Sequence, residues 1–263
     1  MKKIVFIVSI VSLCIQGCSN LAKYEERDGL LYDTRTDSPY SGIRVEYFKN
    51  GYVSHDLMYE NGLMHGKGIF YHENGVKHSE GMMAFGKREG LWKNWYESDT
   101  LMFEVHYSGD IENGPYTEYH ENGNLASIGY RKEGELDSIV SVYDQQGKLQ
   151  SVMNYNAGIQ DGKETKYFIN GNKEYILNFI NGSREGECFI YFENGGLSSH
   201  GYYLNDKLDG PMIAYHTNGA LAGKGVMKTG KLEGWWKYYD LSGVLVEERQ
   251  YQDSILVNTK KFR

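Results

Sequence analysis

The stretch Tyr71-His72-Glu73-Asn74-Gly75 recurs 48 residues later as Tyr119-His120-Glu121-Asn122-Gly123. Related residues return at half that distance along almost the whole chain, so the repeating unit is 24 residues long. Nine units run over 42–257 without insertion or deletion, which is the signature of a repeat architecture. We number the positions of a unit from 1 to 24. Position 1 falls on Gly42, Gly66, Gly90, Gly114, Ser138, Gly162, Gly186, Gly210 and Gly234.

Each unit has the composition of a β-hairpin. Positions 2–8 and 11–19 are rich in Tyr, Phe, Val, Ile and Thr, and an Asx-Gly pair usually lies between them. Position 6 is aromatic in all nine units, and position 10 is Gly in eight, with Asp99 the exception. Position 9 is Asn in six units and position 12 is Leu in six. No sustained 3.6-residue period occurs, so helices are not expected after the N-terminal segment.

The turn between the two strands of a unit can be assigned from the side chains that face each other. A three-residue loop at positions 8–10 pairs position 6 with position 12, so the aromatic residue meets the Leu on one face. Such a loop is a type I turn followed by a left-handed residue, which the Gly at position 10 supplies. We expect the large apolar side chains at the even positions 6, 12, 16 and 18 to share that face. The second connection, at about positions 20–25, is expected to be longer.

Stacked hairpins can bury a continuous stripe although a single hairpin is marginal in water. The predicted fold is therefore all-β, an elongated antiparallel meander of nine tandem 24-residue hairpins with about 18 strands. The predicted organisation is a signal segment at 1–17, a lead-in at 18–41, the nine repeats at 42–257 and a tail at 258–263.

The composition agrees with this fold and excludes several classes of protein. The chain has 263 residues, with 32 Gly, 23 Tyr and only 3 Pro, and Gly does not occupy every third position as collagen requires. Aromatic residues make up 14% of the chain, which argues against disorder. The formal net charge of −7 does not favour binding to nucleic acid or to anionic lipid headgroups.

The N-terminus resembles the signal of a bacterial lipoprotein. Lys2 and Lys3 precede an apolar run at 4–15, which is too short to span a bilayer as a helix. The sequence then ends in Ile-Gln-Gly-Cys at Cys18, and the resemblance implies that this Cys carries a lipid. It further implies an exported protein anchored to a membrane, and Ser19 after the Cys points to the outer membrane of a Gram-negative-type envelope. The alternative is an ordinary signal peptide.

The segments Gly90–Tyr96 (GLWKNWY) and Gly234–Tyr239 (GWWKYY) resemble the MORN-repeat variant family of bacteria. The resemblance covers about 24–257 and is specific for architecture. Many members of this family are labelled antitoxins of the YwqK type. The resemblance therefore implies binding to a protein partner, with a toxin as the partner that the label suggests, but it identifies no functional residue.

No catalytic or metal-binding pattern is evident. The residues His72, His120 and His216 all occupy position 7, so their spacing is that of the repeat. No zinc, P-loop or serine-hydrolase motif occurs, and Cys188 in its strand has no evident His partner. We therefore expect a protein that is not an enzyme, with no cofactor and no metal.

Aromatic side chains at odd positions form the candidate partner-binding surface. It comprises Trp92 and Trp236 at position 3, the adjoining Trp235, and Phe48, Tyr96, Phe168 and Phe192 at position 7. Such aromatics beside acidic turns can form a recognition surface, and the alternative is that they pack as part of the fold. The sequence thus favours a non-enzymatic, membrane-anchored scaffold for a protein partner. Two alternatives remain, a protein that binds cell-wall or other glycans and a structural spacer of the envelope.

Overall fold

The computed structural model describes residues 23–262, which form strands and turns with no helix. A small lead-in sheet contains β1 (Tyr24–Arg27), β2 (Leu30–Asp33) and β3 (Ser38–Pro39). The main sheet contains β4 (Gly42–Tyr47), β5 (Val53–Glu60), β6 (Leu63–Tyr71), β7 (Lys77–Ala84), β8 (Lys87–Trp95), β9 (Leu101–Ser108), β10 (Ile111–Tyr119), β11 (Leu125–Lys132), β12 (Glu135–Tyr143), β13 (Leu149–Asn156), β14 (Ile159–Tyr167), β15 (Lys173–Ile180), β16 (Ser183–Arg184), β17 (Gly186–Tyr191), β18 (Leu197–Leu204), β19 (Lys207–Leu208), β20 (Gly210–Tyr215), β21 (Leu221–Lys228), β22 (Lys231–Tyr239), β23 (Leu245–Gln252) and β24 (Ile255–Lys261).

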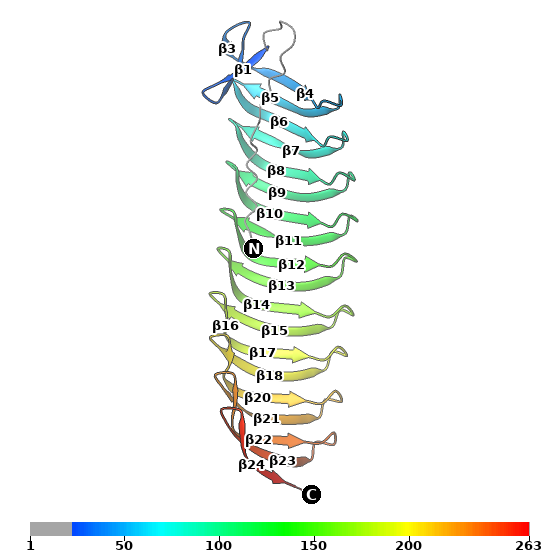
Figure 1. Cartoon of the computed structure of the whole chain (residues 1–263), viewed down its shortest axis with the longest axis vertical. Coiled ribbons are helices and arrows are strands. Elements are labelled where there is room, and N and C mark those ends of the chain that lie inside the picture. The colour runs from blue at the N-terminus through cyan, green and yellow to red at the C-terminus, as the bar shows by residue number, and fades with distance from the viewer. Residues whose placement is uncertain (1–22, 263) are drawn as a thin grey trace.

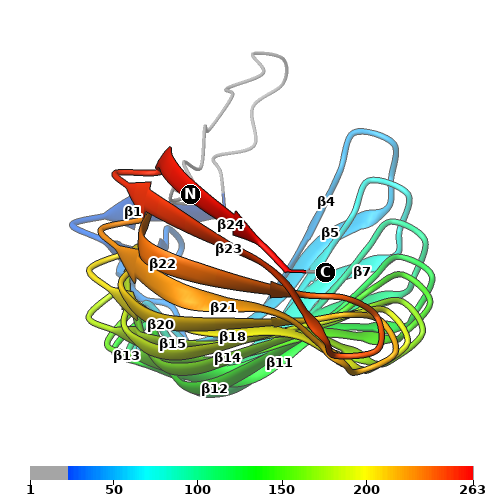
Figure 2. The same ribbon diagram turned by 90° about the horizontal axis from the view of Figure 1, so that it is seen from below.

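The main sheet is a long antiparallel meander, as the sequence predicts. Successive strands pair in chain order, and β4 and β24 lie at opposite ends of the long axis (Figure 1). The strands arch across this axis, so that the sheet forms a trough (Figure 2). The part of the chain that the structure describes contains no helix that could cross a membrane.

The main sheet has more strands than the expected 18. The first strands of the seventh and eighth units are each interrupted, which gives β16 with β17 and β19 with β20. In addition, β24 begins a further hairpin after the ninth unit. Residues 258–261, which the sequence analysis assigns to a tail, therefore continue a strand.

The turn at positions 8–10 has the predicted form. In the first unit, Tyr47 pairs with Val53, and the amide of Phe48 donates to the carbonyl O of Tyr52 at 2.8 Å. The amide of Gly51 donates to the carbonyl O of Phe48 at 3.0 Å, and Gly51 has a φ of 90°. A type I turn closed by a left-handed Gly is thus confirmed.

The prediction of a longer second connection is wrong. It is a two-residue turn at positions 20–21, and both residues have positive φ, as at Asn61 (50°) and Gly62 (81°). This is the type I′ turn, whose twist matches that of the flanking strands. The acidic residue at position 24 lies in the next strand and serves the following turn. For example, a carboxylate oxygen of Glu89 accepts the amide of Gly109 at 2.9 Å.

In every unit after the first, the first strand bulges at position 1. Between β7 and β8, Met82 pairs with Glu89 and Glu80 pairs with Lys93, which leaves residues 90–92 opposite the single residue Gly81. The bulge requires a positive φ at position 1, which is 68° at Gly90. Glycine adopts this conformation without steric cost, so the repeated Gly at position 1 follows from the backbone.

Ser138 is the exception at position 1, with a φ of 64°. The substitution Ser138→Gly is expected to raise the free energy of unfolding by about 0.5–1 kcal/mol, because it relieves a left-handed non-glycine residue. Urea unfolding followed by circular dichroism measures this change, with Gly90→Ser as the reverse control that should destabilise. An equal or lower stability of Ser138→Gly would show that the bulge does not strain the Ser.

The even-position rule for the shared face holds only at the turn. Trp95 pairs with Leu101, but Asn94 pairs with Phe103, so one residue of the second strand is extra. Beyond it, odd positions of the first strand face even positions of the second, and Trp92 lies opposite Val105. Positions 3, 5, 14, 16 and 18 therefore share one face, which we call the packed face. Its buried cluster consists of Met83, Trp92, Val105, Tyr107 and Tyr116.

Large and small residues alternate on the packed face. A Cβ added to Gly81 would lie 2.3 Å from the ring of Trp92, and one added to Gly225 would lie 2.3 Å from the ring of Trp236. The indole Nε1 of Trp92 also donates to the carbonyl O of Met82 at 3.0 Å. The expectation of a large apolar residue at position 16 is thus wrong for these units, because Gly at this position makes room for an indole ring.

The Tyr107 side chain of the packed face is also removed from water. Burial raises the pKa of Tyr107 to about 12.

Candidate binding surfaces

The predicted aromatic surface does not lie on one face. Trp92 and Trp236 are only 4% and 6% exposed, because they form part of the packed face. Trp235 points to the opposite face with 36% of its surface exposed, and the Nζ of Lys260 lies 4.3 Å from its ring centroid. Of the three Trp side chains in the predicted surface, only Trp235 is open to a partner.

The other predicted residues, Phe48, Tyr96, Phe168 and Phe192, lie at the turns and are half-buried. Position 7 can link consecutive units. The hydroxyl of Tyr96 donates to the carbonyl O of Tyr119 at 2.9 Å, and the Nε2 of His72 hydrogen-bonds the carbonyl O of Trp95 at 2.9 Å. This contact explains the recurrence of His at position 7 through the fold.

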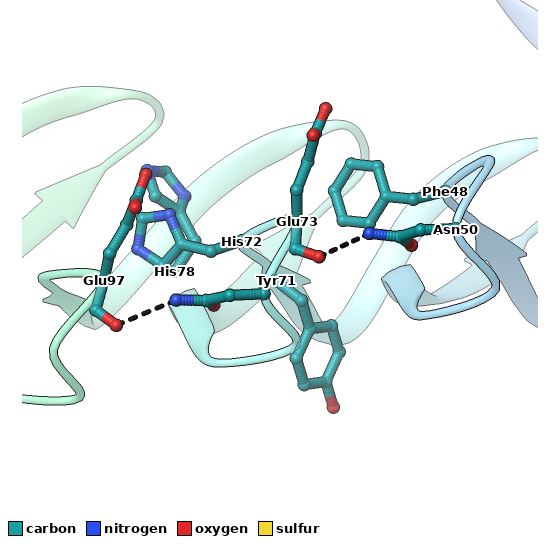
Figure 3. Close-up of a pocket in the computed structure, with 8 residues that line it drawn as sticks. Phe48, Asn50, Tyr71, His72, Glu73, His78 and Glu97 are labelled. Atoms are coloured by element: carbon teal, nitrogen blue, oxygen red, sulfur yellow. Dashed lines mark hydrogen bonds between the residues drawn. The ribbon is translucent and has the colours of Figure 1, made fainter.

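The Asn at position 9 forms a second link between units. In the first unit the Oδ1 of Asn50 accepts the amide of Tyr52 at 3.0 Å. Its Nδ2 donates to the carbonyl O of Glu73 in the next turn at 2.7 Å (Figure 3). The same donation recurs from Asn74, Asn122, Asn170, Asn194 and Asn218. We call this series the asparagine ladder. It accounts for six identical residues without a ligand.

The substitution Asn74→Ala is expected to lower the free energy of unfolding by about 1–3 kcal/mol, because two hydrogen bonds are lost at about 0.5–1.5 kcal/mol each. Ser98 occupies the same position in the third unit, where the ladder is interrupted. Ser98→Asn should restore the link and raise stability by a similar amount. Urea unfolding of both variants tests the pair, and an unchanged stability in either variant would contradict the ladder.

A shallow hollow of about 670 Å³ lies beside these turns (Figure 3). Its lining includes Phe48, His72, His78 and Glu97. The rings of His72 and His78 lie 4.7 Å apart, and burial together with His72 lowers the pKa of His78. Within residues 23–262, no group of three His, Cys, Asp or Glu side chains is placed to hold a metal ion. Cys188 is buried, and burial raises the pKa of its thiol, which disfavours the reactive thiolate.

The face opposite the packed face carries a line of exposed apolar side chains at positions 2 and 17, which we call the exposed row. These two positions lie directly across from each other in every unit, as for Ile43 with Met58 and Pro211 with Val226. Ile43 is 63% exposed and Ile139 is 56% exposed. The large apolar members are Ile43, Met58, Met82, Leu91, Tyr130, Ile139, Val226 and Trp235.

The main chain of the exposed row offers hydrogen-bond acceptors. The bulge leaves position 2 without a partner in the preceding unit, as at Leu91. In several units a side chain donates to the carbonyl O of position 2 instead. The donors are Tyr40 to Ile43 (2.8 Å), His106 to Pro115 (3.2 Å), Asn154 to Lys163 (2.8 Å) and Asn178 to Glu187 (2.7 Å). The carbonyls of Leu91, Ile139 and Trp235 receive no such bond in the described part of the chain.

Cross-strand ion pairs flank the exposed row. The Nζ of Lys93, at position 4, lies 2.6 Å from a carboxylate oxygen of Glu104, at position 15 of the same unit. The carboxylate raises the pKa of Lys93. Because each pair contains one positive and one negative charge, it adds no net charge beside the row. The row can therefore interact with a partner mainly through apolar contact and hydrogen bonds. Sequence reasoning missed the row, although Pro115 and Pro211 at position 2 indicate an amide that needs no partner.

The fold and its surfaces define a repeat-built scaffold, a single long sheet with one packed and one open face. A family model described as MORN repeat variant matches residues 64–83, 88–108, 112–133, 184–205 and 232–253. Five repeats of this chain thus match the MORN repeat variant, and its other units keep the same register.

Several solved structures are similar to this chain, and two serve as examples. The structure of the Photorhabdus luminescens Tc holotoxin pore is similar over 85% of this chain and 14% of that chain, at 13% identity and a TM-score of 0.23. The crystal structure of TcdB2-TccC3 is similar over 80% of this chain and 17% of that chain, at 11% identity and a TM-score of 0.16. This chain thus spans less than a fifth of either, and such TM-scores give no information on function. No curated protein matches the chain significantly.

Proposed function

We propose that this chain is a non-enzymatic scaffold that binds a protein partner through the exposed row. The observation that carries the proposal is the coincidence of exposed apolar side chains with main-chain carbonyls that lack the side-chain donors seen in other units. Such a surface supplies apolar area and hydrogen-bond acceptors together, as protein interfaces do. The two features coincide at Leu91, Ile139 and Trp235, and each of the first five units carries at least one large apolar side chain in the row.

The N-terminal sequence supports anchoring of this scaffold at a membrane through a lipid on Cys18, and that segment lies outside the described residues. The resemblance to YwqK-type proteins supports a toxin as the partner, in an immunity role at the outer membrane. Replacing Cys18 by Ser is expected to move the protein from the membrane fraction to the soluble fraction. A protein that stays with the membrane after this change would argue against the lipid anchor.

The binding proposal is tested by closing the row without disturbing the fold. In Met82→Asn, the new amide should donate to the carbonyl O of Leu91, as Asn154 does to Lys163. Partner recovery from envelope extracts, compared with the native chain, is expected to fall at least tenfold. The control Ile169→Asn changes an exposed apolar residue at a turn, outside the row, and should bind normally. Equal recovery by the two variants contradicts the proposal, and retention on peptidoglycan instead would favour glycan binding.

A further inference from the structure

The two ends of the main sheet differ. Among residues 23–262, β24 pairs with β23 alone, and all seven of its residues are exposed. Its first three residues, Ile255 to Val257, are apolar, and Ile255 is 68% exposed. At the other end, the side chain of Tyr40 from the lead-in covers the start of β4. An exposed apolar edge strand is a template for the addition of another strand.

The hydrogen bonds of β24 show which of its groups are available. The amide of Phe262 donates to the carbonyl O of Val246 at 2.9 Å, so it points toward β23. Because the direction alternates along an antiparallel strand, the amides of Thr259 and Lys261 point away from the sheet. The amide of Thr259 donates to the Oδ1 of its neighbour Asn258 at 2.8 Å, a local bond that a pairing strand would replace. The outer edge therefore presents main-chain groups that another strand can engage.

We propose that β24 pairs antiparallel with β24 of a second copy of this chain, about a twofold axis at Thr259. In this register the outward amide and carbonyl of Thr259 bond reciprocally to those of its copy. Leu256 then faces Phe262 of the second copy, which gives an apolar cross-strand pair on each side of the axis. Thr259 faces Thr259, a β-branched pair that favours strands.

The charges of β24 favour this register over the parallel one. A parallel in-register pair would place Lys260 and Lys261 opposite their own copies, whereas the antiparallel pair places them opposite Asn258 and Val257. Each Lys also lies opposite a Glu of β23 in its own chain. Lys261 pairs with Glu247, and Lys260 pairs with Glu248, whose carboxylate lies 3.7 Å from the Nζ of Lys260. A twofold contact uses both edges and closes, so it yields a dimer rather than a fibre.

The molar mass in solution tests the pairing. Light scattering after gel filtration should give twice the 30.1 kDa of the chain at high concentration. Thr259→Pro removes an outward amide together with its local bond to Asn258, which an exposed edge strand tolerates, and should halve the mass. Thr259→Ser keeps the amide and should remain dimeric. Circular dichroism confirms that both variants fold. The proposal is overturned if the native chain has the mass of a monomer at every concentration, or if Thr259→Pro remains a dimer.

Cysteine cross-linking tests the register. In a chain with Cys14→Ser and Cys18→Ser, only the buried Cys188 remains. Thr259→Cys should then form a disulfide-linked dimer under mild oxidation, because directly opposed residues of such a pair lie about 5.5 Å apart. Ile255→Cys lies far from its own copy in this register and should stay monomeric on denaturing gels. Cross-linking of both variants to the same extent overturns the twofold axis at Thr259.

Discussion

Trp92→Ala is expected to lower the free energy of unfolding by about 3–5 kcal/mol, the range for deletion of a large buried aromatic side chain. The indole of Trp92 lies directly over Gly81, and its loss leaves a cavity with no side chain to fill it. It also removes the hydrogen bond to the carbonyl O of Met82. Urea unfolding followed by circular dichroism measures the difference.

Trp235→Ala is the matched control for this prediction. The same residue type is removed from the opposite face, where Trp235 contacts solvent and Lys260, so the expected change is within about 0.5 kcal/mol. Similar losses of stability in the two variants would contradict the assignment of faces. The comparison matters for function, because it separates the Trp that builds the sheet from the Trp that is available to a partner.

Gly225→Ala is expected to lower the free energy of unfolding by about 1–3 kcal/mol, because its methyl group would meet the ring of Trp236 and overpack the face. Gly223 lies two residues earlier in β21, and the nearest atom to a Cβ there is the carbonyl O of Lys237 at an ordinary 3.4 Å. Gly223→Ala should be neutral, or should stabilise by about 0.4–1 kcal/mol because it lowers the conformational entropy of the unfolded chain.

Thermal and urea unfolding of the two glycine variants decide between packing and backbone effects. If glycine were needed at both positions only for flexibility, both variants would lose stability equally. A selective loss in Gly225→Ala, restored in part by Trp236→Leu in the same chain, supports the contact between ring and backbone. The double variant is needed because residues in contact do not act additively.

The repeat length, the hairpins and the first turn could be predicted because they depend on local residues. Asn50 and Gly51 define one turn, and Tyr47 and Val53 define its pairing. The second turn could not be predicted from the Gly at position 21 alone, because the residue before it, as at Asn61, also adopts a positive φ. Residues such as Phe85 and Ala157 occupy the same place in other units, so their side chains gave no turn signal.

The faces could not be predicted because bulges change which positions are opposite each other. One extra residue next to the turn moves Trp92 to the same face as Tyr107, although position parity separates them. The exposed row escaped prediction for a related reason. Its acceptor carbonyls arise from the bulge at position 1, which one sequence marks only by Gly and by proline at Pro115 and Pro211.

The arrangement of the strands has a mechanical consequence. All strands of the main sheet run across the long axis, so their hydrogen bonds lie along it (Figure 1). Tension applied between the lead-in and β24 would therefore act in the unzipping geometry. It would break the hydrogen bonds of one strand pair at a time, rather than shear many bonds together. Because each unit contacts only its neighbours, the molecule would extend in equal steps at low force. Under tension, such a molecule would lengthen before a stronger attachment at either of its ends breaks.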